Sequence, residues 1–490
     1  MADKAVAASP AAGRLVVSDV NPRYFTVRSG RAAVYLTGSH LNNNFHDGMG
    51  PGADCPEVPE ESDFGAYLDF LVDHGHNFIR LWRWELVKSQ VGGGNFHACM
   101  TPQPWSRSGP GMARDGKPKF DLSAFDEAYF RRLRHRVAAA GERGIYTSVM
   151  LFEGFSLHLT PPPDNVEGHP FHAANNVNGI SITSIVDYQV LPLHPDIQAL
   201  QEAYLRRVVD TVHDLPNVLY EVANESSGDT ADSVRLPDGS VIETPIGDTT
   251  QWQYWVIDYV KRYERQRGYD AHPVGMTMQY PVPDQTKVNE PLFRSPADWI
   301  SPGFDDTPMP SNSRWLTDPP AGDGAKVIIS DTDHYSPFRS DAPWAWKSFL
   351  RGLHPILYDF GIFNLREPLD PSVGLPPYEA YEPARHAMGD TLRYARRVNL
   401  IEMEPRGELS STGYALANPG EEYLVLQPGG AGDPFTVAVA AGSYAAEWYS
   451  VTSRETVEAG TLAVGSESPV SFRAPFETPG PAVLYLRRVS

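Results

Sequence analysis

Residues 217–228, NVLYEVANESSG, begin as a buried strand and end on a carboxylate. Their apolar residues are those that a buried β-strand favours, namely Val218, Leu219, Tyr220, Val222 and Ala223. By the two-residue repeat of a strand, Glu221 and Glu225 share one face. Burial of an unpaired charge is costly, so we interpret Glu225, at the strand end, as a functional residue. Glu221 fits a hydrogen bond inside the fold equally well.

Short apolar runs alternate with helical patterns on both sides of this stretch. We expect strands at residues 32–38, 77–82, 145–151, 218–223, 273–280, 297–301, 326–330 and 354–360. Helices are expected between most of them, although no long helix is expected between 273–280 and 297–301. One helix is predicted to begin with a capping box formed by Ser123 and Asp126.

This alternation predicts a parallel sheet, and about eight such units fit a closed (β/α)8 TIM barrel. A doubly wound open sheet is the alternative, but no glycine-rich phosphate fingerprint follows the first strand. From about residue 405 short alternating strands separated by Gly and Pro predict a small all-β sandwich. We therefore expect a barrel with an N-terminal hairpin over 14–400 and a β-sandwich over 405–490. The sandwich fits a packing appendage at least as well as a binding module.

Composition excludes some functions. The net charge is -20, from 41 Lys and Arg against 61 Asp and Glu, which argues against a nucleic-acid partner. Cys55 and Cys99 are too few for a disulfide framework or a cysteine-based zinc site. No apolar run approaches the roughly 20 residues of a membrane span, so no membrane partner is expected. No signal peptide is seen, so a cytoplasmic protein is expected, although a chain trimmed of its leader would look the same. The oligomeric state is open.

Loop lengths indicate which end of the barrel is functional. Connections from helix to strand are short, at 74–76, 141–144 and 214–217. Connections from strand to helix are long, at 83–122, 152–195, 226–248 and 302–325. In a TIM barrel the long connections gather at the carboxyl ends of the strands, where active sites lie. Glu225 is expected at that end.

The segment YEVANE, residues 220–225, resembles the fourth-strand signature of the clan A glycoside hydrolases, a (β/α)8 superfamily that includes cellulases and mannanases. NFIRLW, residues 77–82, supplies the Asn77 and Arg80 that this superfamily tends to carry on strand two. The hairpin, barrel and C-terminal sandwich likewise resemble cellulase-like or DUF4038-like hydrolases. The resemblance implies that Glu225 is the general acid/base and that Asn224 binds a sugar hydroxyl. It also implies that Arg80 holds the catalytic carboxylates in place.

Hydrolysis of a glycosidic bond needs a second carboxyl group beside the acid. In the superfamily it is a Glu that ends strand seven, whereas KVIISDTDHYS, residues 326–336, contains no Glu. Asp331 is the first choice, and Asp333 shares its face and follows closely. Because Asp is one methylene shorter than Glu, the gap could exceed the roughly 5–5.5 Å of retaining enzymes, or a shift of the backbone could restore it. Retention and inversion both stay open.

Several other polar and aromatic residues at the same end are candidates for sugar contact, because aromatic faces stack on sugar rings. Those chosen as substrate-binding are His40, Trp84, Glu85, Glu153, His158, Tyr280 and His334. Asn42, Asn43, Asn44, His46 and Trp82 lie beside them in sequence. Strand eight offers Tyr358 and Asp359 where many clan A enzymes offer a Trp, which leaves the sugar identity open.

Two other functions compete with a glycosidase. The first is a metal-dependent hydrolase on the same barrel, because Asp331, Asp333 and His334 are residue types that bind metals. However, strand one does not contain the HxH motif with which amidohydrolase barrels begin. The histidines of 74–76 lie at a helix end, on the opposite face of the barrel. A barrel that binds carbohydrate without catalysis is the second, because the usual strand-seven Glu is missing. We favour a glycoside hydrolase that acts on a carbohydrate substrate without a metal or other cofactor.

Overall fold

The computed structural model describes residues 10–28, 30–42, 44–51, 61–91, 96–159, 166–228, 234–235, 241–242, 247–282, 284–306, 313–335, 341–359, 362, 378–429 and 432–489. Asn43 and Cys55, named above, lie outside these residues. No helix within these ranges is both long and apolar enough to cross a membrane.

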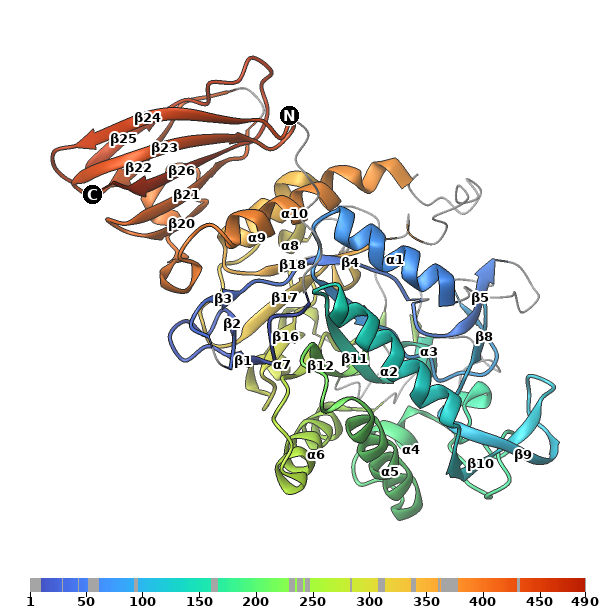
Figure 1. Cartoon of the computed structure of the whole chain (residues 1–490). Helices are drawn as coiled ribbons and strands as arrows, with labels where there is room; N and C mark the ends of the chain where they lie inside the picture. Colours follow the sequence, from blue (N-terminus) through green and yellow to red (C-terminus); the bar gives the residue numbers. More distant parts are fainter. Residues whose placement is uncertain are drawn as a thin grey trace.

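Eight parallel strands form the barrel at the centre of the molecule (Figure 1). In chain order they are β4 (Gly38–His40), β6 (Phe78–Leu81), β11 (Tyr146–Glu153), β12 (Val218–Asn224), β15 (Val274–Thr277), β16 (Trp299–Ser301), β17 (Val327–Asp331) and β18 (His354–Tyr358). The strands pair in the order β4-β18-β17-β16-β15-β12-β11-β6. The predicted TIM barrel is thus confirmed.

The first and second barrel strands meet through hydrogen bonds just before each begins. The side chain of Asn77 accepts a bond of 2.9 Å from the backbone N–H of Thr37, and the N–H of Asn77 donates to the Thr37 carbonyl at 2.9 Å. Gly38 permits this approach, because a Cβ there would lie 2.2 Å from the carbonyl oxygen of Phe78. These contacts close the sheet between β4 and β6.

Helices surround the barrel (Figure 1). The main ones are α1 (Glu61–Asp73), α2 (Glu127–Glu142), α5 (Pro195–Val212), α6 (Thr250–Arg267), α9 (Ala342–Leu350) and α10 (Glu382–Ala395). The others are short: α3 (Phe155–Leu159), α4 (Ile185–Gln189), α7 (Glu290–Arg294) and α8 (Arg314–Thr317). Only α7 is an α-helix between β15 and β16 in the described part, so the expected lack of a long helix there is confirmed.

The long connections carry small sheets of their own. A three-stranded sheet joins β5 (Asp47–Pro51), β8 (Phe96–Thr101) and β7 (Ser89–Val91). A hairpin joins β9 (Trp105–Met112) to β10 (Pro118–Phe125). A second hairpin, β13 (Val234–Arg235) with β14 (Val241–Ile242), follows β12.

Two local predictions were wrong. The run 32–38 is not the first barrel strand. Residues Ala33–Val34 of this run form β3, which pairs with β2 (Phe25–Val27) in an N-terminal sheet that also contains β1 (Leu15–Val17). The first barrel strand therefore begins only at Gly38. Ser123 does not cap α2 either. It lies in β10 with its hydroxyl on Asp121, and Asp126 itself caps the helix by accepting from the N–H of Ala128 at 2.8 Å.

The C-terminal part forms a separate antiparallel β-structure, drawn in red in Figure 1. Its six-stranded sheet has the order β19 (Glu404–Pro405), β20 (Ala415–Asn418), β21 (Glu422–Gln427), β26 (Ala482–Arg488), β23 (Gly442–Ser450) and β24 (Thr456–Val464). A second sheet pairs β22 (Phe435–Val439) with β25 (Ser468–Phe472). Val437, Trp448 and Leu484 belong to its own core, which confirms the expected all-β sandwich. Arg397 of the barrel part pairs with Glu447 at 2.8 Å.

We expect Gly38→Ala to destabilise the protein by about 1–3 kcal/mol, because the new methyl group would overlap the backbone of β6. Gly65→Ala in α1 is the matched control, since nothing lies within 4 Å of a Cβ there and Ala favours a helix. Thermal unfolding followed by circular dichroism should show a lower midpoint for Gly38→Ala only. Equal midpoints for the two variants would contradict the tight approach of β4 and β6.

Candidate active site

The guanidinium of Arg80, on β6, lies at the centre of the candidate site and uses all five of its N–H groups. Nε and Nη2 donate to the two oxygens of Glu221 at 3.0 and 2.5 Å, and Nη2 also donates to the side-chain oxygen of Asn224 at 2.8 Å. Nη1 donates to Asp331 at 2.9 Å and to Asp333 at 3.1 Å. One side chain thus joins the ends of β6, β12 and β17.

Glu221 has a structural role in this arrangement. It is fully buried on β12 with both oxygens on Arg80, and the hydroxyl of Ser148 donates to it at 3.3 Å. A buried ion pair of this kind persists only when its hydrogen bonds are satisfied. Of the two interpretations open for Glu221 from the sequence, the structure shows the hydrogen-bonded one.

Asp331, the last residue of β17, is enclosed by donors. The Nε2 atom of His40 lies 2.9 Å from it, Arg80 binds its second oxygen, and the N–H of Asp333 donates to it at 3.0 Å. The indole N–H of Trp82 donates to Nδ1 of His40 at 3.2 Å, so a neutral His40 carries its proton on Nε2 and donates to Asp331. Burial raises the pKa of Asp331, but His40 and Arg80 outweigh it and hold that pKa well below its ordinary value.

Asp333 lies one short turn further on, in the 3-10 helix Thr332–His334 (η4). Within the described residues only its Oδ2 atom accepts a hydrogen bond, from Arg80 at 3.1 Å, and Nε2 of His334 lies 3.8 Å from the same oxygen. Its side chain is 11% exposed, whereas that of Asp331 is 0% exposed. Burial and the negative charge of Asp331 raise the pKa of Asp333 to about 6. Asp333 is therefore the more exposed of the two strand-seven carboxylates.

Glu225 follows β12 in a constrained backbone. Its φ of 45° lies in the left-handed region, which costs a non-glycine residue of order 1–3 kcal/mol. His158 donates to its carbonyl at 2.8 Å, and Gly154 lets the loop after β11 approach, because a Cβ there would lie 2.4 Å from Cα of Ser226. Strain of this kind, held by neighbouring loops, is common at functional sites.

The carboxyl group of Glu225 accepts no side-chain hydrogen bond within the described part of the chain. Burial and then the negative charge of Asp333 raise its pKa well above the ordinary value, against the opposing effect of Arg80. Two carboxyl groups whose pKa values are both raised thus lie after β12 and β17, and such perturbed groups are common at functional sites.

Aromatic rings line the same region. The rings of His40 and Trp82 are stacked with centroids 6.3 Å apart, and Tyr358 at the end of β18 lies 5.4 Å from His40 and 5.9 Å from Trp82. Burial, and after it the charges of Asp333 and Glu225, raises the pKa of the Tyr358 phenol. The ring of Trp84 stacks on that of Trp82 with centroids 6.0 Å apart, and both side chains are buried.

Glu85 and Glu153 belong to a neighbouring buried network instead of the Arg80 cluster. Glu85 accepts from His169 at 3.0 Å and from Tyr188 at 2.6 Å, and Arg83 lies 3.1 Å away. Burial raises the pKa of Glu85, but Arg83 and His169 outweigh it and lower that pKa overall. Burial likewise raises the pKa of Glu153, which reaches about 8. Glu153 accepts from the N–H and hydroxyl of Ser156.

The remaining candidates hold the loops together. His334 lies 2.9 Å from the hydroxyl of Ser301, and burial lowers its pKa to about 3. Burial also lowers the pKa of His158, to about 4. Tyr280 is half-buried, with its ring 6.4 Å from that of Phe304. Asn42, Asn44, His46 and Asp359 are also enclosed: the carbonyl of Asn42 accepts from Trp84, Asn44 donates to the Arg80 carbonyl, His46 is buried, and Asp359 pairs with Arg385.

Sequence reasoning missed the residues of the long 152–195 connection that support the site. The hydroxyl of Ser226, next to Glu225, donates to the side-chain oxygen of Gln189 at 2.7 Å. His169 and Tyr188 hold Glu85 as described above. None of these residues has a spacing in the sequence that relates it to a barrel strand, so only the folded loop reveals its part.

Comparison with solved structures supports the fold. A structure described as a glycoside hydrolase shares 13% identity with a TM-score of 0.61, and the match covers 97% of each chain. A glycoside hydrolase family 5 protein from Bacteroides vulgatus ATCC 8482 shares 14% identity with a TM-score of 0.59, over 97% of this chain and 94% of that one. No protein-family model and no curated protein sequence matches this chain. At such identities the likeness shows a common fold, in agreement with the barrel and C-terminal β-domain expected from the sequence.

Arg80→Lys should strongly destabilise the protein, because one ammonium group cannot replace the five donors that satisfy Glu221, Asp331 and Asp333. Loss of one partner of a buried ion pair typically costs about 3–5 kcal/mol. The matched control is Arg134→Lys, whose pair with Asp214 is about half exposed and should matter little. Thermal unfolding of the two variants measures the difference, and equal midpoints would show that Arg80 does not organise the strand ends.

Proposed function

We propose that the chain hydrolyses O-glycosidic bonds, with Glu225 as the acid and Asp333 as the carboxylate that faces the anomeric carbon. The observation that carries this proposal is that a carboxyl group after β12, which accepts no side-chain hydrogen bond in the described residues, and a partly exposed carboxylate after β17 lie close enough for the charge of Asp333 to raise the pKa of Glu225. Glycosidases need one protonated and one ionised carboxyl group on either side of the scissile bond. The fold shared with solved glycoside hydrolases supports the same function.

The choice of Asp333 over Asp331, the first choice from the sequence, rests on hydrogen bonding. Asp331 is fully buried and its oxygens are engaged by His40, Arg80 and the N–H of Asp333. Asp333 keeps one oxygen without a donor in the described residues and is partly exposed. We therefore assign Asp331 as a positioning residue that orients His40 and Arg80.

The proposed reaction begins when Glu225 donates its proton to the glycosidic oxygen and the bond to the anomeric carbon breaks. The leaving group departs as an alcohol. Asp333 then either bonds to the anomeric carbon, to be displaced by water that loses its proton to Glu225, or removes the proton from the attacking water directly. Both courses consume one water and balance as hydrolysis. The anomeric form of the first product distinguishes retention from inversion.

Trp82, Tyr358 and Asn224 are the proposed sugar contacts nearest to these carboxyl groups. Aromatic faces pack on the apolar faces of sugar rings, and an amide binds a hydroxyl. Asn224 is oriented by Arg80, so its side-chain oxygen is occupied and its amino group remains to donate to the substrate. A carbohydrate is accordingly the proposed substrate class.

The metal-dependent alternative is weaker. Asp331, Asp333 and His334 do lie close enough to share an ion. However, Nη1 of Arg80 already holds both aspartates, so the place of a metal cation beside them is filled by a guanidinium. Activity that is unchanged after treatment with EDTA would agree with the two-carboxylate proposal.

Glu225→Gln should reduce the rate on aryl glycosides with poor leaving groups by about 10²–10⁴-fold, because these need a proton on the departing oxygen. The loss should be much smaller with a dinitrophenyl leaving group, which departs without a proton. Asp333→Asn should reduce the rate with both kinds of substrate. A panel of aryl pyranosides and furanosides identifies the sugar first. The control Glu447→Gln removes a buried carboxylate of the C-terminal domain and should keep the wild-type rate.

The opposite pattern would overturn these assignments. If Asp331→Asn abolishes activity while Asp333→Asn does not, then Asp331 is the reacting carboxylate. If all three variants keep the wild-type rate, the chain is not a glycosidase of this kind, and retained sugar binding would then support a non-catalytic barrel.

The activity should depend on pH as a bell. On the acid side it should fall as the pH drops through about 6, because Asp333 becomes protonated. On the alkaline side it should fall as the pH rises through the raised pKa of Glu225, which then loses its proton. Measurement of kcat/KM against pH tests this. In the wild-type protein the alkaline limb should appear with a substrate whose leaving group needs a proton and be absent with a dinitrophenyl substrate, while the acid limb appears with both. An equal alkaline limb with both substrates would contradict the role of Glu225.

A further inference from the structure

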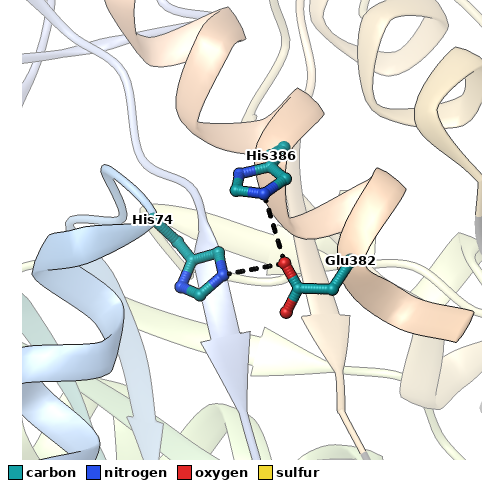
Figure 2. A group of neighbouring side chains, drawn as sticks. All are labelled: His74, Glu382 and His386. Carbon is teal, nitrogen blue, oxygen red and sulfur yellow. Dashed lines mark hydrogen bonds and ion pairs between the residues drawn. The ribbon is translucent and has the colours of Figure 1, made fainter. Parts of the chain in front are cut away.

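A second cluster of titratable residues lies away from the Arg80 site. The histidine–glutamate cluster consists of His74, which follows α1, and of Glu382 and His386 one turn apart on α10. Figure 2 shows the two rings pointing toward the same carboxylate oxygen. The Nε2 atoms of His74 and His386 each lie 3.2 Å from Oε2 of Glu382. Three ligand-type atoms thus converge on one point.

These distances match the geometry of a zinc site. Zinc binds imidazole nitrogen and carboxylate oxygen at about 2.0–2.2 Å, and in a tetrahedral site two such ligands lie about 3.3 Å apart. Both nitrogen–oxygen separations in the cluster are close to that edge. The three ligand atoms all lie within 4.8 Å of one another, so a small movement of the rings would complete the site.

The hydrogen bonds of His74 direct Nε2 toward Glu382, as a metal ligand requires. Its Nδ1 atom lies 2.8 Å from the carbonyl oxygen of Phe70, which can only accept, so Nδ1 carries a proton. In a neutral ring Nε2 then presents a lone pair to the carboxylate of Glu382, an unfavourable contact unless a cation or a second proton lies between them. Histidine ligands of metals commonly donate their other N–H to a backbone carbonyl in this way.

Glu382 is oriented as a metal-binding carboxylate would be. Its second oxygen accepts a hydrogen bond of 2.7 Å from Arg385. Arg385 is in turn fixed by Asp359, whose oxygens accept at 2.7 Å from Nε and Nη2. Oε2 is therefore directed toward the two histidines, and such support of a ligand typically strengthens metal binding.

His386 has a competitor that metal binding must displace. Nη1 of Arg454 lies 3.2 Å from its Nδ1 atom, so the neutral ring now carries its proton on Nε2, facing Glu382. For Nε2 to bind a metal, the proton must move to Nδ1 or leave. Arg454 keeps its other partner, because it also donates to Asp390 at 2.9 and 3.1 Å.

We propose that His74, Glu382 and His386 bind one Zn²⁺ ion, with water in the fourth position. The side chains are 12%, 28% and 38% exposed, so an ion and its water can reach them from solvent. The ion links the residue that follows α1 to α10, which contacts the barrel strands β4 and β18, and lies next to Arg454 of the C-terminal part. Its role is structural and independent of the hydrolysis assigned to Glu225 and Asp333.

Isothermal titration of ZnCl₂ into the full-length, untagged protein, stripped with EDTA and desalted, tests this proposal. We expect one bound Zn²⁺ per chain, a higher thermal unfolding midpoint with Zn²⁺ and none of this with MgCl₂, because Mg²⁺ prefers oxygen ligands. His74→Gln and His386→Gln should each weaken Zn²⁺ binding at least tenfold. His194→Gln is the matched control, since His194 is an exposed histidine 3.7 Å from Asp196 and should bind as wild type does.

The variant Asp331→Asn separates this site from the barrel centre. Zn²⁺ binding should be unchanged in Asp331→Asn, which leaves the histidine–glutamate cluster intact. If binding is lost in Asp331→Asn and kept in His74→Gln, the ion belongs to the Asp331, Asp333 and His334 group and the proposal is wrong. It is also wrong if the wild-type protein binds no Zn²⁺, or if His74→Gln and His386→Gln bind as tightly as His194→Gln.

Discussion

The candidate site depends on the guanidinium of Arg80, whose five N–H groups hold three carboxylates and one amide. A single positive charge thus faces the negative charges of the buried Glu221 and Asp331 and of Asp333, which is 11% exposed. Buried charges interact strongly because the dielectric response around them is weak. Desolvation, and after it the negative charge of Asp333, raises the pKa of the fourth carboxyl group, that of Glu225. Arg80 therefore fixes the geometry of the carboxyl groups on which the proposed reaction depends.

Neighbouring strands and loops position the carboxyl groups around Arg80 by hydrogen bonds and close backbone contacts. Asp331 takes up the donors of His40, Arg80 and a backbone N–H, so it stays ionised and unavailable. Burial and the negative charge of Asp331 together raise the pKa of the next carboxylate, Asp333. On the opposite strand the left-handed backbone at Glu225 is held by His158 and by the close approach at Gly154. Asp331, whose two oxygens accept several hydrogen bonds, thus lies beside Asp333, whose oxygens accept fewer. This difference in hydrogen bonding is the basis of the different roles proposed for them.

Much of the fold followed from local patterns, because apolar runs and helical faces specify buried strands and helices directly. The strand-one error arose where two sheets compete for the same run, a tertiary effect that periodicity does not contain. The placing of Arg80, Asn224 and Glu225 came from two short motifs on strands. The preference for Asp333 over Asp331 in the proposed reaction could not be predicted from the sequence, since it depends on donors from β4 and β6. Glu85 was a candidate for sugar contact, and its hydrogen bonds to His169 and Tyr188 could not be predicted because these partners lie far along the chain. The same holds for the pair of His74 and Glu382.

The most direct test of this account is the titration of the Glu225 carboxyl group by carbon-13 NMR, on protein labelled at glutamate side-chain carboxyl carbons. The resonance is assigned by its absence in Glu225→Gln. The account predicts that Glu225 remains protonated at neutral pH in the wild-type protein, and that its pKa falls in Asp333→Asn, where the facing negative charge is gone. An ordinary pKa for Glu225, or one that Asp333→Asn leaves unchanged, would show that the two carboxyl groups do not form one site.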